Sequence, residues 1–241
     1  MNNKEASFLK QLTEPRLVIG FLIFVSLACF GMTLSFDFLT FDDNTFITKN
    51  DIVASDDFTF ADCFRYKFME HDYFPLTFLI FRLLRVLFGF NPLVFHALNV
   101  VLHIANVILV FVLCTKILKK FVVESTLSVW AGAIALIFAI HPMHVESVAW
   151  VIDLKDILFT LFYLAGVLTY MKWLETRNKT SYTLTIVFAL ISLLSKSTAI
   201  TFIAILFLTD WLQGEKINKK TLIPKIPFFA VTLFGFYVFG L

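Results

Sequence analysis

Two adjacent carboxylates, Asp42 and Asp43, are the first residues of the chain whose type and position suit chemistry. A carboxylate can act as a general base that takes a proton from an acceptor hydroxyl. The pair stands a few residues after a hydrophobic segment, in a polar passage from Phe36 to Pro75 that holds nine of the eighteen acidic residues. Such a passage is either a solvated loop or an active site. The aromatic residues around the pair, which would hold it against a bilayer, favour the active site.

A stripe of polar residues runs along an otherwise apolar segment, at successive spacings of three, four and three: His96, Asn99, His103 and Asn106. At about 100° per residue these positions share one helical face. Polar residues inside a membrane span normally face a bundle interior or a water-filled cavity. Interhelical hydrogen bonding is favoured for Asn106, whereas His96 and His103 suit substrate binding equally well.

A third cluster consists of His141, His144 and Glu146, beside a proline that disfavours helix in the preceding residue. Two imidazoles and a carboxylate could bind a divalent metal such as Mn or Mg, although the spacing is not a known helix-face ligand pattern. Lys196, between two serines in an apolar run, is a further candidate, because a lysine inside a membrane pairs with an anion. Together these groups suit a reaction that releases an anionic phosphate.

The composition indicates an integral membrane protein. The chain is 59% hydrophobic and 16% charged, whereas soluble domains carry roughly 25% charged residues. The net charge of +2 argues against nucleic acid as a partner. Three scattered cysteines indicate neither a disulfide framework nor a zinc site.

We predict an all-α polytopic bundle of about seven spans, because a span needs about 20 mostly apolar residues. The predicted spans are Leu17–Phe36, Leu93–Leu118, Leu127–Ile140, Ile157–Trp173, Tyr182–Leu194, Thr198–Leu212 and Ile226–Leu241. The segment Leu76–Phe90 is short for a crossing and carries two arginines on one side. It is therefore predicted to be an amphipathic helix that lies in the membrane interface.

The distribution of Lys and Arg predicts the orientation, since cytoplasmic loops are enriched in both. It places the N-terminus in the cytoplasm, with a tail at residues 1–16, a transmembrane domain at 17–241 and a long non-cytoplasmic first loop at 37–92. The acidic pair, the His141 cluster and Lys196 then lie on the same side. We expect them to converge on that non-cytoplasmic face.

Six sequence blocks carry a resemblance to a known family. They are FDDNTFI (41–47), PLT (75–77), FHALNVVLH (95–103), HPMHVESVAW (141–150), KDIL (155–158) and LLSKSTAI (193–200). In this order, over roughly residues 17 to 213, they resemble the membrane half of the O-mannosyltransferases that carry tetratricopeptide repeats. Those enzymes are relatives of the protein O-mannosyltransferases in the GT-C superfamily, and the HPMHVESVAW block is the most specific part of the resemblance.

The resemblance implies a GT-C-like fold and an inverting glycosyltransferase. The donor would be a sugar, in the family mannose, on a polyprenyl or dolichyl phosphate. The acceptor would be a Ser or Thr hydroxyl on the periplasmic face of a bacterial inner membrane or the lumenal face of the endoplasmic reticulum. The family's catalytic acidic pair corresponds to Asp42 and Asp43, and the His141 cluster matches the family block.

The chain departs from the family pattern at three positions. Phe74 stands where the family usually has arginine, Lys155 replaces an arginine near the fourth span, and Ser197 replaces an acid. Other cations would then bind the donor phosphate. The candidates are Arg82, Arg85, Lys155 and Lys196.

Two alternatives stay open from the sequence. One is a catalytically inactive or truncated relative that binds lipid or a partner protein, because the seventh run stops at Leu241 and no repeats follow. We accordingly expect a chain truncated at its C-terminus. The other is a transporter, for which inverted repeats with paired broken helices are expected. The sequence contains no such repeat.

Overall fold

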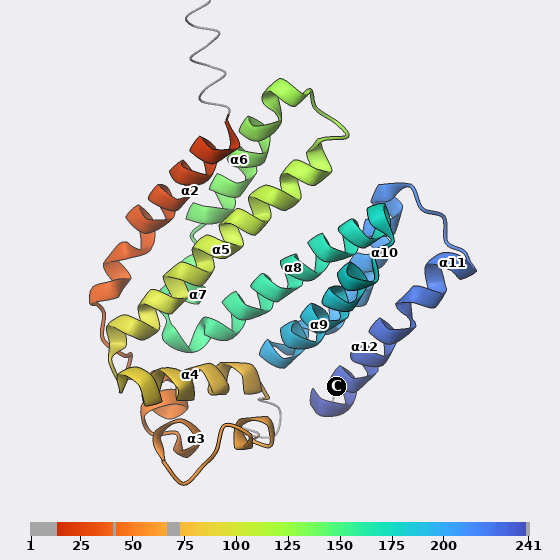
Figure 1. The fold of residues 1–241 in the computed structure, drawn as a ribbon. Helices are drawn as coiled ribbons and strands as arrows, with labels where there is room; N and C mark the ends of the chain where they lie inside the picture. The colour runs from red at the N-terminus through yellow and green to blue at the C-terminus, as the bar shows by residue number, and fades with distance from the viewer. Residues whose placement is uncertain (1–13, 41, 67–72, 240–241) are drawn as a thin grey trace, which may run out of the picture. The chain divides into compact units, whose positions relative to one another are not determined.

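The computed structural model describes residues 14–40, 42–66 and 73–239. These residues form helices joined by short connections, with no strand among them (Figure 1). This confirms the predicted all-helical class. The chain divides into two compact units. Unit 1 comprises the described residues up to Leu39 together with Asn91–Asp153, and unit 2 comprises Thr40–Phe90 together with the chain from Leu154 onward.

Unit 1 is built on three helices that lie side by side, α2, α5 and α6 (Figure 1). Its elements are α2 (Pro15–Phe30), the 3₁₀ helix η1 (Gly31–Ser35), α5 (Pro92–Leu118), α6 (Glu124–Ile140), α7 (His144–Ala149) and the 3₁₀ helix η4 (Val151–Asp153). The helices enclose a core of Leu22, Val107, Phe111, Ala131, Ala135 and Ala139. The three alanines of this core recur every four residues along α6. This face of small side chains lets neighbouring helices approach closely.

Unit 2 combines the polar passage with the second half of the chain. Its elements are the π-helical turn η2 (Asn44–Thr48), α3 (Asp51–Ala54), η3 (Asp62–Phe64), α4 (Pro75–Phe88), α8 (Leu154–Thr176), α9 (Lys179–Ser195), η5 (Ser197–Thr201), α10 (Phe202–Gln213), α11 (Lys219–Leu222), η6 (Ile223–Lys225) and α12 (Ile226–Phe239). Helices α8 and α9 pack along each other as a hairpin.

Local sequence explains where several helices begin and end. The side chains of Asn91 and Asn178 each accept a backbone N–H of the first helical turn, and so cap α5 and α9. Helix α6 ends immediately before His141-Pro142, as the proline predicts. Gly89 ends α4 with a φ of 65°, a conformation that glycine adopts without steric cost.

Three helical stretches of the described chain are long and apolar enough to cross a membrane: Pro15–Ser35, Pro92–Leu118 and Lys219–Phe239. Glu124–Ile140, Lys179–Ser195 and Ser197–Gln213 are apolar but shorter. Helix α8, which covers the predicted fourth span, is not among either set. The structure is therefore compatible with membrane insertion, while the count of seven spans and the orientation stay predictions.

The predicted interfacial segment forms the amphipathic helix α4. Its outward face exposes Leu83, Val86 and Leu87, while Phe78 and Phe81 are fully buried. The exposed apolar face is what a helix lying in a membrane interface requires.

Candidate functional site

The acidic pair introduces the π-helical turn η2. The Asp43 side chain is fully buried, with 0% of its surface exposed, whereas Asp42 is half-buried. The turn is closed by side chains, since Thr48 Oγ1 donates to Asn44 Oδ1 at 2.9 Å. Single π-helical turns are rare and occur frequently at functional sites. The two carboxylates therefore differ in access, and Asp42 is the one that a molecule from outside can reach.

Ring contacts join η2 to the start of α4 and of α8, all within unit 2. The ring of Phe46 lies 5.9 Å from that of Phe74, the residue before α4. The Nζ of Lys155 lies 5.8 Å from the centroid of the same Phe74 ring. Phe74 thus lies between the turn that follows the acidic pair and a lysine.

A second lysine joins this group through an ion pair. Lys196 Nζ donates to the carboxylate of Asp156, the residue next to Lys155 in the first turn of α8. Both side chains are partly exposed, at 35% for Lys196 and 25% for Asp156. Lys196 has extended backbone angles that separate α9 from η5, which directs its side chain to α8. Two cations and one carboxylate are thereby gathered at the N-terminal end of α8, where the helix dipole also favours an anion.

Arg82 and Arg85 have other partners than the predicted phosphate. The Arg82 side chain is buried and donates to the main-chain carbonyls of Ile52, Ser55 and Phe58. Arg85 forms an ion pair with Asp56, and that hydrogen bond lowers the pKa of the Asp56 carboxyl. Both arginines hold the loop that follows α3. Their contact with a donor phosphate stays a prediction.

In unit 1, the polar stripe of α5 faces the interior, and all four of its side chains are buried. Asn99 Nδ2 donates to the carbonyl oxygens of Val148, at 3.4 Å, and Trp150, at 3.2 Å. His103 Nε2 donates to the carbonyl of Ala139 at 3.1 Å. Asn99 and His103 thus link α5 to α6 and to the chain around α7. Substrate binding by His96 and His103, and interhelical bonding by Asn106, stay predictions.

The predicted metal ligands lie at the break between α6 and α7. The rings of His141 and His144 have centroids 6.2 Å apart. Burial lowers the pKa of His144, and the charge of His141 adds to this effect. Among the described residues, however, no three His, Cys, Asp or Glu side chains come together as a metal-binding group. His141, His144 and Glu146 are thus not a ready ligand set, and metal dependence stays a prediction.

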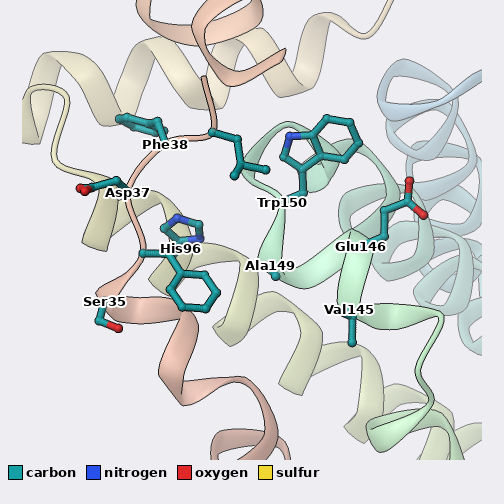
Figure 2. A pocket seen from close by; sticks show the side chains of 10 residues that line it. Ser35, Asp37, Phe38, His96, Val145, Glu146, Ala149 and Trp150 are labelled. Atoms are coloured by element: carbon teal, nitrogen blue, oxygen red, sulfur yellow. The ribbon is translucent and has the colours of Figure 1, made fainter. Parts of the chain in front are cut away.

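A cavity of about 620 Å³ in unit 1 was not foreseen from the sequence (Figure 2). Its walls are the segment Ser35–Leu39, the side chain of His96 on α5, and residues of α7 with the following Trp150. The signal that pointed to it was the run of aromatic residues just after the first span, at Phe36 and Phe38. In the sequence this run predicts an anchor against the bilayer.

A buried ion pair was also missed. Lys225 stands directly before the apolar run at 226–241, and its side chain is completely buried. Its Nζ donates to the carboxylate of Asp210, to the hydroxyl of Tyr170 at 3.0 Å and to the carbonyl of Thr221 at 3.0 Å. Tyr170 in turn donates to Asp210 at 2.7 Å. The position of Lys225 close to the apolar α12 was the only sequence signal.

The structure brings together only some of the predicted site residues. Asp42, Asp43, Lys155 and Lys196 belong to unit 2, with Arg82 and Arg85. The histidines of the stripe and the His141 cluster belong to unit 1. Convergence of the clusters of the two units on one face stays a prediction.

Curated proteins similar to this chain are named protein O-mannosyl-transferases. TMTC2 of Mus musculus is 31% identical over 214 residues, covering 84% of this chain and 25% of that protein. TMTC4 of Mus musculus is 31% identical over 235 residues, covering 88% of this chain and 31% of that protein. Tmtc1 of Drosophila melanogaster is 37% identical over 139 residues, covering 58% of this chain and 15% of that protein. These similarities confirm the predicted resemblance to the O-mannosyltransferases.

No family model matches the chain, and no solved structure matches it. The chain spans about a quarter of the length of TMTC2 and about a third of that of TMTC4. The similarity thus extends over most of this chain but over a minor part of each relative.

Proposed function

We propose that the protein is a membrane glycosyltransferase that moves a sugar, mannose by the names of its relatives, from a polyprenyl or dolichyl phosphate to a protein Ser or Thr hydroxyl. The acidic pair would face the non-cytoplasmic side of the membrane, bacterial or of the endoplasmic reticulum. The names of the similar proteins support the transfer of mannose to protein. The carrier and the face rest on the resemblance and on the charge distribution.

One structural observation carries the proposal. Within unit 2, the turn that follows Asp42 and Asp43 is joined through Phe46 and Phe74 to Lys155 at the start of α8. Lys196, the residue after α9, pairs with Asp156 in the same turn of α8. A transfer reaction of this class needs a base for the acceptor and positive charge for the leaving phosphate. The turn supplies the base, and the lysines supply the positive charge.

The proposed chemistry assigns the two carboxylates different tasks. Asp42, which is half-buried, takes the proton of the acceptor hydroxyl while the hydroxyl oxygen bonds to the anomeric carbon. The bond from that carbon to the phosphate oxygen breaks, and the electron pair leaves with the polyprenyl phosphate. The configuration at the anomeric carbon inverts. Asp43, which is fully buried, acts through the turn and holds Asp42 in place.

The leaving group gains negative charge during this step. Lys155 and Lys196 lie where they can meet that charge, with the N-terminal end of α8. The ion pair with Asp156 keeps Lys196 extended toward α8 before the donor arrives. If a divalent metal assists, it would add a further positive charge at the same phosphate.

The direct test is to change Asp42 and Asp43 to Asn one at a time in the full chain, reconstituted in lipid nanodiscs. Transfer of radiolabelled mannose from dolichyl phosphate to a library of Ser- and Thr-containing peptides is then measured. We expect Asp42→Asn to lower the rate on the order of 10²-fold or more, because general-base catalysis contributes that much. Asp57→Asn is the control, since Asp57 is an exposed acid of the same passage that binds Ser55. Undiminished transfer in both Asp42→Asn and Asp43→Asn would remove the proposal.

The lysines are tested by Lys196→Met and Lys196→Arg. We expect the neutral variant to lose transfer and the arginine variant to keep part of it, because Arg retains the charge. Lys172→Met serves as the control, since Lys172 is exposed near the other end of α8. Equal transfer by Lys196→Met and the unaltered protein would exclude a role of Lys196 at the phosphate.

A further inference from the structure

We infer that the cavity of unit 1 binds the linear apolar chain of a membrane lipid. The cavity measures about 620 Å³ and lies between the segment that follows η1, the first turns of α5, and α7 (Figure 2). Close-packed protein interiors contain few voids larger than a water molecule. A space of this size belongs instead to the range of ligand pockets, about 300–1,000 Å³.

The character of the wall selects an apolar occupant. Most of the lining is apolar, from Phe36, Phe38, Leu39, Val145, Ala149 and Trp150. Two carboxylates stand at its margin, and Figure 2 shows those of Asp37 and Glu146 pointing in opposite directions, with His96 between them. A cationic ligand in the middle would therefore meet no carboxylate. A chain of methylene or isoprene groups would bury its surface against the aromatic rings.

The position of the cavity gives a lipid chain access. Ser35 is the last residue of the candidate span Pro15–Ser35, and His96 stands in the first turns of the candidate span Pro92–Leu118. The cavity therefore lies where the apolar core of a bilayer meets its interface. Nearby side chains are apolar and exposed, among them Leu93 at 53% and Val145 at 54%. A lipid chain could enter past them without crossing water.

Two kinds of lipid share this chemistry, the phospholipids of the bilayer and a polyprenyl phosphate. The inference concerns the chain-binding site and does not rest on the proposed transfer reaction. Its test therefore uses labelling and not activity. The full chain is placed in nanodiscs that contain either a phosphatidylcholine or a polyprenyl phosphate carrying a photoreactive diazirine on its chain. After irradiation, the labelled peptides are identified by mass spectrometry.

We expect labelling of the peptides that contain residues 35–39 and 145–150. Ala149→Trp would fill the cavity and should lower that labelling at least fivefold, whereas Ala28→Trp, at an exposed position of α2 outside the cavity, should leave it unchanged. The probe that labels more strongly identifies the source of the chain. If Ala149→Trp does not fold, Val145→Trp, at the exposed rim, replaces it.

Two results would overturn the inference. The first is labelling of these peptides that is equally strong in Ala149→Trp, because the chain would then lie outside the cavity. The second is the absence of labelling with both probes, as expected if the cavity receives an apolar side chain of a polypeptide.

Discussion

The guanidinium of Arg82 lies 2.7 Å from the carbonyl oxygen of Ile52, thirty residues earlier in the chain. The same guanidinium also donates to the carbonyls of Ser55, at 2.9 Å, and Phe58. Charged donors make the stronger hydrogen bonds of proteins. Arg82 thereby connects the loop after α3 to α4.

Arg82→Met should consequently loosen the loop. It removes three charge-assisted hydrogen bonds and leaves the buried carbonyl of Ile52 without its donor, so we expect a loss of about 3 kcal/mol in the free energy of unfolding. Limited proteolysis should then cut between residues 52 and 60, and denaturant titration in detergent micelles gives the energy. The matched control is Arg85→Met, whose partner Asp56 is 85% exposed, and which should change stability little. Equal sensitivity of the two variants to protease would contradict this role of Arg82.

Much of the fold could be predicted because apolar runs and their breaks are local signals. The end of α6 at His141-Pro142 and the interfacial helix now seen as Pro75–Phe88 follow from proline and from helical periodicity. The buried stripe that starts at His96 follows from the same periodicity. The number of spans does not follow, because only three helical stretches of the described chain are long and apolar enough to cross a membrane, and three further apolar helices are shorter.

The site could be predicted only as separate residues. The sequence identifies Lys196 as a cation that pairs with an anion, but its partner Asp156 lies forty residues away and no local pattern joins them. The sequence assigns Arg82 to a phosphate, and in the structure its two Nη groups donate to main-chain carbonyls. Backbone carbonyls leave no mark in a sequence, so a tie of this kind is visible only in the structure.

The buried pair of Lys225 and Asp210 predicts a strong effect on stability. Asp210→Leu would leave a buried ammonium without its counter-charge, since Lys225 is 0% exposed and Asp210 is 7% exposed in this pair. We expect a loss of about 3–5 kcal/mol in the free energy of unfolding. Denaturant titration of the purified chain measures it.

The double variant Asp210→Leu with Lys225→Met distinguishes the effect of the unpaired charge on stability from the effect of altered packing. Replacing both members of a buried ion pair by apolar residues is often neutral or stabilising. The double variant should therefore recover most of the stability lost in Asp210→Leu. If the double variant has the same free energy of unfolding as Asp210→Leu, the loss of stability comes from packing and not from the unpaired charge.

His144 predicts a dependence of stability on pH. Burial lowers its pKa below the usual value of about 6.5, so the unfolded chain binds a proton that the folded chain does not. Stability should therefore fall as the pH drops from 6.5 toward the lowered pKa and level off below it. His144→Phe keeps a ring against Phe138, whose centroid lies 4.3 Å away, and removes the titration. The difference in melting temperature between pH 7.5 and pH 5.5 should shrink in this variant, and an unchanged difference would exclude His144 as its source.

The contact between α2 and α6 depends on Gly132. A Cβ added there would lie 2.6 Å from Cγ1 of Val18, so the Val18 side chain or one of the two helices must shift. We expect Gly132→Ala to lower the free energy of unfolding by about 1–2 kcal/mol, because the energetic cost of overpacking is larger than the energy gained from the higher helix propensity of alanine. Gly20→Ala is the matched control, since nothing lies within 4 Å of its added Cβ, and it should be neutral or slightly stabilising. Val18→Ala combined with Gly132→Ala should restore stability, because it removes the opposing methyl group. A defect that persists in this double variant would show that the close approach at Gly132 is not what holds α2 against α6.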